Sequence, residues 1–133
     1  MKVKMNNKIR VLIVQPNKEA KQVRIEHSLK DLQNVVGGLI EYIALDRNTD
    51  VICNEEGKLM NLELNRVLGR DVIAGTFLVV GNHYGEIISL SKKQLKKYKK
   101  FFCIENSKSK IDFLEDLGIK SSDLVRHYYN AWG

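Results

Sequence analysis

The run Thr76–Val80 (TFLVV) constrains the fold more than any other segment, because β-branched and aromatic residues fill four of its five positions. Such residues fit a pleated, half-buried strand better than a helix. The segment Gly81–Gly85 (GNHYG) follows and predicts a hairpin turn, after which Glu86–Leu90 (EIISL) returns as a second strand. A chain built around this hairpin is expected to form an antiparallel sheet.

Four other short segments have strand character. Ile9–Val14 (IRVLIV) is apolar throughout except for one arginine and predicts a buried strand, while Gln22–Glu26 alternates apolar and polar residues and can pair with it as a hairpin. Leu39–Leu45 has two fairly apolar faces, which predicts a central strand. Val51–Cys53 is expected to pair back onto Leu39–Leu45 through a polar turn.

The segment between Val51–Cys53 and Thr76–Val80 is polar and contains three glycines. Asn54–Gly57 predicts a turn, with Gly57 available for a positive φ. Scattered leucines after this turn predict an irregular or one-turn helical loop rather than further strands. We therefore expect a glycine-punctuated loop flanked by two strands of the sheet.

Capping signals and apolar spacing predict four helices. Ser28 and Asp31 open the first helix, which ends at Gly37. Ser91 and Gln94 form the strongest capping box, and the helix that follows buries Leu95, Tyr98, Phe101 and Phe102 and exposes six lysines.

Two shorter helices are predicted at Ser109–Leu117, with Asp112 completing a capping box, and at Ser122–Trp132. At 133 residues the chain has the length of one domain. The predicted fold is α+β: a mainly antiparallel sheet of about five to six strands, with helices packed on one side and a C-terminal helical extension. We divide the chain into an α+β domain at residues 9–103 and the extension packed on it at residues 104–133.

The formal net charge of +6 and the pI near 9.3 favour anionic partners, although small domains also carry such charge for solubility. Cys53 and Cys103 lie in apolar surroundings, and the sequence leaves open whether they are free thiols or a disulfide. Since no CxxC or Cys/His cluster occurs, no metal site or other cofactor is expected. The N-terminus contains no long apolar run, so we expect a cytoplasmic protein without membrane association.

The polar residues of the glycine-punctuated loop are the first candidate site. Arg66 and Arg70 can form a fork on a phosphate, and Asn54 and Asn65 can bind polar edges of a ligand. An aromatic residue, Tyr42 or Tyr84, can stack on a base. The competing interpretation is that Asn and Gly serve turn geometry while the arginines pair with nearby carboxylates. No acid–base pair or nucleophile accompanies these residues, so no catalytic residue is predicted.

A second candidate site is the lysine-rich helix at residues 91–102, where Lys93 and Lys97 can contact nucleic acid. The segment Phe113–Arg126 has the outline of a helix-turn-helix, with groove-facing residues Lys120, Ser122 and Arg126. The competing interpretations are a solvated face of an amphipathic helix and an ordinary packing unit.

Several blocks of the sequence occur in a fixed order: IRVLIVQP, a capped helix ending in VVGGLIEYIAL, then CNEEGKL, LNRVLG and DVIAGTFLVVG, and another capped helix. In this order the chain resembles a phage- and plasmid-borne family of small proteins that is described as a domain of unknown function. The resemblance covers about residues 9–102, and the C-terminal segment lies outside it. It implies a mobile-element setting in a bacterial host but no activity and no site residues.

Small non-enzymatic phage proteins often act against host defence, and one class sequesters nucleotide immune signals such as cyclic dinucleotides. By this analogy of setting we expect a non-catalytic binding protein that captures a small anionic nucleotide-like ligand, as a homo-oligomer in the bacterial cytoplasm. Two alternatives stay open. One is a DNA-binding protein that uses the basic helix and the helix-turn-helix-like C-terminus. The other is a protein inhibitor of a host defence enzyme, docked through an exposed sheet edge or the aromatic C-terminal helix.

Overall fold

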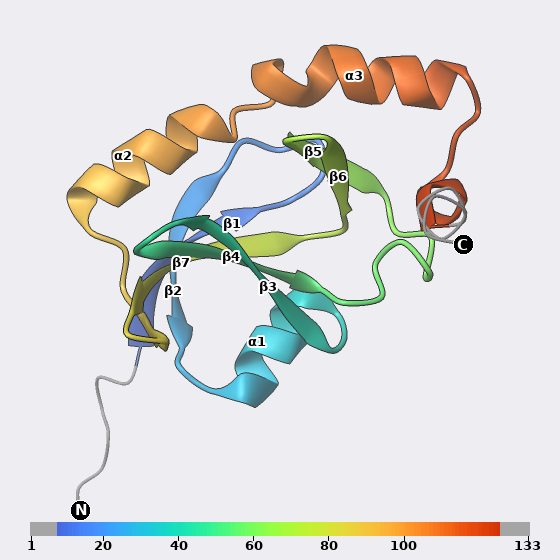
Figure 1. The fold of residues 1–133 in the computed structure, drawn as a ribbon. Coiled ribbons are helices and arrows are strands. Elements are labelled where there is room, and N and C mark those ends of the chain that lie inside the picture. The colour runs from blue at the N-terminus through green and yellow to red at the C-terminus, as the bar shows by residue number, and fades with distance from the viewer. Residues whose placement is uncertain (1–7, 126–133) are drawn as a thin grey trace, which may run out of the picture.

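The computed structural model describes residues 8–125, and its central feature is a six-stranded sheet (Figure 1). The strands of the chain are β1 (Lys8–Val14), β2 (Lys21–Glu26), β3 (Ile40–Asp46), β4 (Thr49–Asn54), β5 (Leu64–Leu68), β6 (Asp71–Ala74), β7 (Phe77–His83) and β8 (Glu86–Ile88). The sheet has the order β2-β1-β7-β4-β3, with β8 paired to β7, and every pair is antiparallel. β5 and β6 form a separate hairpin. The predicted α+β fold with a mainly antiparallel sheet is confirmed.

Three helices are described in full: α1 (Leu29–Val36), α2 (Lys92–Phe101) and α3 (Glu105–Asp116). The predicted caps of the first two are confirmed. Ser28 Oγ accepts from Asp31 N, and Ser91 and Gln94 form a reciprocal capping box. Each cap satisfies backbone N–H groups that the first helical turn leaves without partners, which is why these two helices begin where the sequence places them.

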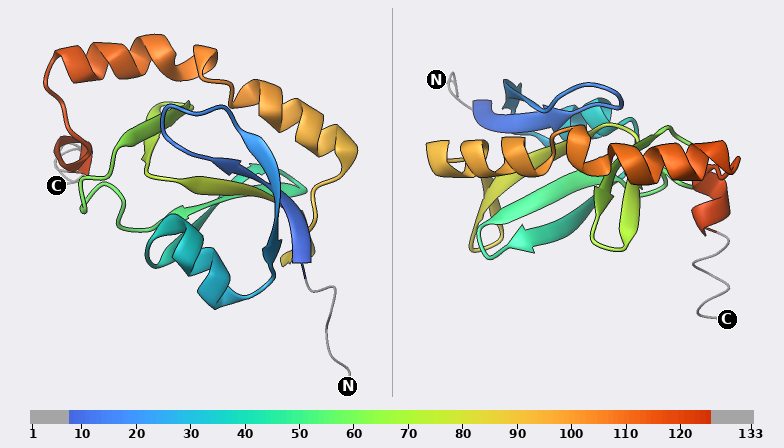
Figure 2. Two further views of the ribbon diagram at one scale, coloured as in Figure 1. Left: turned by 180° about the vertical axis from the view of Figure 1, so that it is seen from behind. Right: turned by 90° about the horizontal axis from the view of Figure 1, so that it is seen from above.

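Helices cover both faces of the sheet, although the sequence led us to expect them on one side (Figures 1 and 2). α1 packs with Leu32 and Val36 against residues such as Val11. α2 packs with Leu95 and Tyr98 against the opposite face. The physical reason lies in the central strands, which are apolar on both sides and would leave one apolar face in water if only one were covered. The apolar residues of β1, β4 and β7 alternate between these two cores.

The β3 strand forms an edge of the sheet, which corrects the prediction of a central position for Leu39–Leu45. Ile43 and Ile40 pack on opposite faces, but Tyr42 is 53% exposed. The central strand is β7, and β4 lies between β7 and β3 with all six of its residues buried. Polar residues of β4 are tolerated there because they have partners, as in the hydrogen bond from Asn82 Nδ2 to Asp50 Oδ2 at 2.7 Å.

The segment that was expected to be an irregular loop contains the β5–β6 hairpin, with Gly69 in the left-handed region at φ 62°. The Asn54–Gly57 turn is confirmed, but Gly57 has no positive φ. A Cβ at Gly57 would lie 2.7 Å from the Ala74 carbonyl oxygen, so glycine is needed for close approach of two backbones. The β5–β6 hairpin was not predicted, because apolar spacing in so short a segment does not distinguish a strand from a loop.

The α3 helix packs on this hairpin through Leu114, which contacts the cluster that contains Leu64 and Val72. It begins at Glu105, four residues before the predicted start at Ser109. Residues 121–125 are helical, and the rest of the helix predicted at Ser122–Trp132 lies outside the described residues. The extension thus covers the small hairpin rather than a face of the main sheet.

Candidate functional site

The predicted ligand residue Arg66 is buried, with 1% of its surface exposed. Its guanidinium donates from Nε to Phe102 O at 2.8 Å, from Nη1 to Asn65 O at 3.2 Å and Asn65 Oδ1 at 2.8 Å, and from Nη2 to Lys18 O. Burial lowers the pKa of this guanidinium, while the Glu19 carboxylate opposes the shift. Arg66 therefore holds β5 against the β1–β2 turn and the end of α2.

Asn65 is also buried, at 3% exposure. Its Nδ2 donates to Val14 O at 2.9 Å and to Gly75 O at 2.8 Å. Together Asn65 and Arg66 connect the small hairpin to the main sheet, and we call this pair the buried clasp. Because the donors of the clasp face carbonyl oxygens inside the protein, the structure supports the structural interpretation of these two residues and leaves no phosphate fork at Arg66.

The other predicted ligand residues lie on separate elements. Asn54 is buried and holds its own turn, since Nδ2 donates to Val36 O at 3.2 Å and Oδ1 accepts from Glu56 N at 2.8 Å. Arg70 is exposed in the β5–β6 turn, and Tyr42 is exposed on β3. Tyr84 is 97% exposed in the β7–β8 turn. The structure therefore does not gather the six predicted residues around one ligand.

The lysines of α2 form one continuous exposed face. At about 100° per residue, the six positions fall within an arc of about 160° opposite the buried Leu95 and Tyr98. Lys97 Nζ lies 3.8 Å from Asp46 Oδ2. Within residues 8–125, no carboxylate lies within 4.0 Å of the other five amines. We call Lys92, Lys93, Lys96, Lys97, Lys99 and Lys100 the lysine face.

A shallow groove of about 620 Å³ adjoins the lysine face between the first turn of α2 and the β3–β4 and β7–β8 turns. We call it the basic groove, because Arg47, Lys93 and Lys97 line it together with His83. Sequence reasoning identified the two lysines but missed Arg47 and His83. Arg47 lies in the β3–β4 turn and His83 ends β7, and only the packing of these two segments beside α2 brings them together.

Hydrogen bonds fix the floor of the basic groove. Gln94 Nε2 donates to Asn48 O at 2.9 Å and to Thr49 Oγ1 at 2.8 Å, which ties α2 to the β3–β4 turn. Tyr98 donates to Asp46. Burial disfavours ionisation of Asp46, but the hydrogen bonds from Tyr98 and from Asn48 N outweigh burial and lower the pKa of this carboxyl. Burial, together with the same Asp46 contact, raises the pKa of Tyr98 to about 12.

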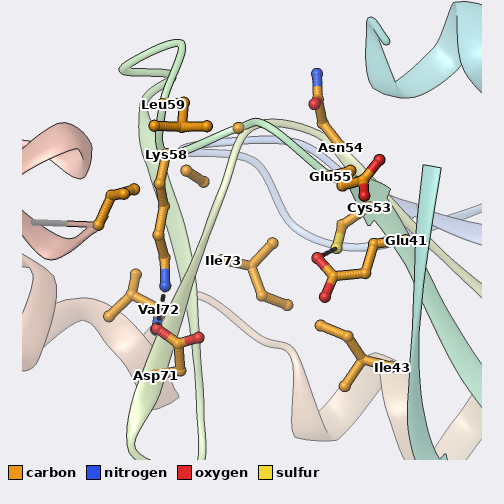
Figure 3. A pocket seen from close by; sticks show the side chains of 13 residues that line it. Glu41, Ile43, Cys53, Asn54, Glu55, Lys58, Leu59, Asp71, Val72 and Ile73 are labelled. Carbon is orange, nitrogen blue, oxygen red and sulfur yellow. Dashed lines mark hydrogen bonds and ion pairs between the residues drawn. The ribbon is translucent and has the colours of Figure 1, made fainter. Parts of the chain in front are cut away.

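A second cavity, of about 310 Å³, lies between β3, β4 and β6 (Figure 3). We call it the acidic cavity, because Glu41, Glu55 and Asp71 line it with Lys58 as the single cation among its lining residues. Figure 3 shows Lys58 paired with Asp71 on one side and Glu41 beside Cys53 on the other. Ile43 and Ile73 give it an apolar wall.

The cysteines are free thiols, with Cys53 buried and Cys103 half-buried. Cys53 Sγ lies 4.0 Å from Glu41 Oε1. Burial, together with the negative charge of Glu41, raises the pKa of the Cys53 thiol to about 12. The thiol therefore stays protonated at neutral pH, and it does not provide the thiolate that a nucleophilic site requires.

The helix-turn-helix interpretation has little support in the described residues. Ser122, expected in a DNA groove, faces its own chain, since its Oγ donates to Asn61 Oδ1 at 3.4 Å and its backbone N donates to the same oxygen at 3.3 Å. Lys120 is exposed, and Arg126 lies outside the described residues. Residues 121–125 lie at the far end of α3 from α2, as both views show (Figures 1 and 2). The two predicted nucleic-acid surfaces are therefore not continuous.

Residues 9–103 match the family described as Domain of unknown function (DUF3846), and the chain belongs to that family. The match ends just before α3 begins at Glu105. No curated protein and no solved structure matches the chain. The described helices lack the length and apolar character that crossing a bilayer requires. Within residues 8–125, His, Cys, Asp and Glu side chains nowhere form a group of three or more that could hold a metal ion.

Proposed function

We propose that this protein is a non-catalytic nucleic-acid-binding protein that contacts phosphates with the lysine face of α2 and with the basic groove. The observation that carries the proposal is the lysine face itself. It presents six exposed ammonium groups in one arc, and five of them have no carboxylate within 4.0 Å in the described part of the chain. Uncompensated amines attract phosphates and release their counterions on binding.

The length of the lysine face favours a polymer over a single phosphate group. From Lys92 to Lys100 it extends about 12 Å along the helix axis, which is more than one phosphate needs. Arg47 widens the same positive surface across the basic groove. Repeated phosphates along a nucleic-acid strand match this arrangement.

Tyr84 favours nucleic acid with unpaired bases. The residue is 97% exposed at the tip of the β7–β8 turn, and its ring lies edge-on to His83, with the ring centroids 4.6 Å apart. Since His83 lines the basic groove, the exposed ring stands at the border of the positive surface. An exposed aromatic face beside cations is the combination that single-stranded nucleic acid uses for stacking.

The test is fluorescence anisotropy with a labelled single-stranded oligonucleotide and a labelled duplex, each titrated across a salt series. The variant Lys93→Glu/Lys97→Glu should bind both probes about 10- to 100-fold more weakly than wild type. The slope of log affinity against log salt should fall in magnitude by about 0.7 per lost contact for the single strand. Tyr84→Ala should weaken binding of the single-stranded probe more than binding of the duplex.

The matched control is Lys21→Glu/Lys30→Glu. These two lysines are exposed on the α1 side of the sheet, opposite α2. Both double variants lower the formal net charge from +6 by 4, to +2, so only the position of the charges differs. Equal losses in the two variants, or affinity that does not depend on salt, would contradict the proposal.

A second candidate is capture of a small nucleotide signal in the basic groove, supported by the groove volume of about 620 Å³. Arg47 and Lys93 would take phosphate, and a second copy of the chain would close the open side. A thermal shift with cyclic dinucleotides or cyclic ADP-ribose derivatives, and recovery of the unaltered nucleotide on heating, would favour this version. A thermal shift with oligonucleotides alone would favour the polymer.

The setting in this proposal is a phage or plasmid in a bacterial cytoplasm, where the binding would counter a host defence. It rests on the resemblance of the ordered sequence blocks to phage- and plasmid-borne proteins. We expect that expression of the wild-type protein protects a phage or plasmid from the host defence. The variant Lys93→Glu/Lys97→Glu should lose this protection. Full protection by that variant would separate any defence role from the basic surface.

A further inference from the structure

The outer edge of β3 has no partner strand in the described part of the chain, because β3 is last in the sheet order. Leu39 O accepts from Glu55 N at 2.8 Å. Hydrogen-bonding residues alternate along an antiparallel strand, so the odd-numbered residues of β3 bond to β4. The backbone groups of Ile40, Tyr42 and Ala44 therefore face outward, where another strand can pair with them.

The acidic cavity lies directly beside this edge. Glu41 and Ile43 of β3 both line it, and Figure 3 shows their side chains directed toward it. Residues of an added strand that stand opposite Glu41 and Ile43 would point to the same face of the sheet. Every second side chain of that strand would thus reach the cavity or its rim.

The charge of the cavity selects the side chain that enters it. Lys58 is paired with Asp71, while no cation of the described residues lies within 4.0 Å of Glu41 or Glu55. The two remaining carboxylates favour a cation, although the chain as a whole carries a net charge of +6. Attraction of a basic segment to this edge is therefore local and not a product of the overall field.

The size and walls of the cavity point to one side chain as its occupant. Its volume of about 310 Å³ is at the lower limit for small-molecule pockets. Ile43 and Ile73 can cover an aliphatic stem, while Glu41 receives the charged end. Lysine and arginine have this combination of an apolar stem and a cationic end.

We propose that β3 and the acidic cavity form a docking site for an extended basic segment of a partner protein. The segment pairs with β3 as an added strand and inserts a lysine or arginine beside Glu41. This site is separate from the phosphate-binding surface of α2 and goes beyond the nucleic-acid function. The other edge of the sheet does not suit the same partner, because β2 exposes Lys21 and Arg24.

The test uses a fluorescein-labelled peptide, acetyl-Thr-Val-Thr-Lys-Thr-Val-Thr-amide, in anisotropy titrations against the full chain. Wild type should bind it saturably, and a peptide with glutamate in place of the lysine should bind about tenfold more weakly or not at all. Glu41→Gln should weaken binding of the lysine-containing peptide about twofold to fivefold. The matched control Glu26→Gln, on β2, should leave this binding unchanged. Lys93→Glu/Lys97→Glu should bind the peptide at least as tightly as wild type.

Amide hydrogen exchange followed by NMR locates the added strand. Bound peptide should slow exchange at Ile40, Tyr42 and Ala44, whose N–H groups face outward, more than at Glu41 and Ile43. Ala44→Pro should weaken binding because it removes one of these donors. No saturable binding at millimolar peptide, equal binding of the two peptides, or slowed exchange on β2 instead of β3 would overturn the proposal. The variant Lys93→Glu/Lys97→Glu is expected to keep peptide binding. The peptide test and the oligonucleotide test therefore judge the two proposed sites separately.

Discussion

The sequence offers two regions as candidate phosphate-binding sites, and the folded protein uses their cations in opposite ways. The buried clasp of Asn65 and Arg66 gives its donors to carbonyl oxygens of four segments and of Asn65 itself. The lysine face of α2 is exposed, and among the described residues five of its six amines have no carboxylate within 4.0 Å. A cation that is already paired has no free donor for a ligand, whereas an unpaired cation on the surface attracts one.

The comparison teaches that desolvation separates the structural cations from the binding ones. A guanidinium is suited to the clasp because its planar fork can satisfy several carbonyls at once and it is weakly hydrated. Ammonium groups on flexible stems remain hydrated and are easily exchanged between water and phosphate. We expect the two regions to respond in opposite ways to substitution, one in stability and the other in binding.

The largest effect is expected for Arg66→Met. The substitution removes the donors for three backbone carbonyls and for Asn65 Oδ1 while preserving much of the side-chain volume. The free energy of unfolding should fall by about 3 kcal/mol, measured by urea denaturation. The matched control Arg47→Met, at an exposed arginine, should change it by less than about 0.5 kcal/mol. Equal stability of the two variants would contradict the role of the clasp.

A smaller loss of stability is expected for Asn65→Ala. It leaves Val14 O and Gly75 O without the amide that satisfies them, at a cost of about 2 kcal/mol. Asn34→Ala, on the exposed side of α1, is the control and should be nearly neutral. Oligonucleotide affinity of the folded Asn65→Ala protein should equal that of wild type. A large loss of affinity in folded protein would instead return this residue to the ligand site.

Arg47→Met should affect binding and spare stability, the reverse of Arg66→Met. Loss of one phosphate contact should weaken binding of a single-stranded oligonucleotide about threefold to tenfold. It should also lower the magnitude of the slope of log affinity against log salt by about 0.7. Anisotropy titrations at several salt concentrations measure both quantities. If Arg47→Met binds as wild type does, the basic groove does not contribute and the lysine face acts without it.

The smallest effect is expected for the pH dependence of Tyr98. Its hydroxyl has an ordinary pKa of 10.0, which burial together with Asp46 raises to about 12 in the folded protein. The contribution of the protonated Tyr98 hydroxyl to the free energy of unfolding is complete below pH 10, where the folded and unfolded states both keep the proton. It is lost as the pH rises from 10 toward 12. Urea unfolding at several pH values should show a steeper loss for wild type than for Tyr98→Phe. Parallel curves would show that Tyr98 is not shifted.

Much of the fold could be predicted because local rules and tertiary structure agree. The side-chain caps at Ser28 and Ser91 fix helix starts through contacts three residues apart. The hairpin from Phe77 to Ile88 follows from a β-prone run and a glycine-containing turn. Where rules for local sequence conflicted with tertiary contacts, prediction failed. The capping pattern at Ser109 did not start a helix, because α3 already begins at Glu105.

The candidate site was predicted in part, and the reason is the range of the contacts. Lys93 and Lys97 could be found because neighbouring residues of one helix share a face. The residues Arg47 and His83 could not, since they reach the basic groove from the β3–β4 turn and the end of β7, which are distant in sequence. The acidic cavity was missed for the same reason, because Glu41 and Asp71 lie 30 positions apart and meet only across two sheets.

The sequence by itself determined the strands with β-branched runs, the capped helices, the net positive charge and the lysine face. These properties depend on residues within a few positions of each other or on composition alone. Tertiary structure decided that β7 is central and β3 is an edge, and that helices cover both faces. It also decided that Asn65 and Arg66 point inward. Burial and pairing depend on which distant segments meet, and a polar side chain takes its role from the partners it finds there.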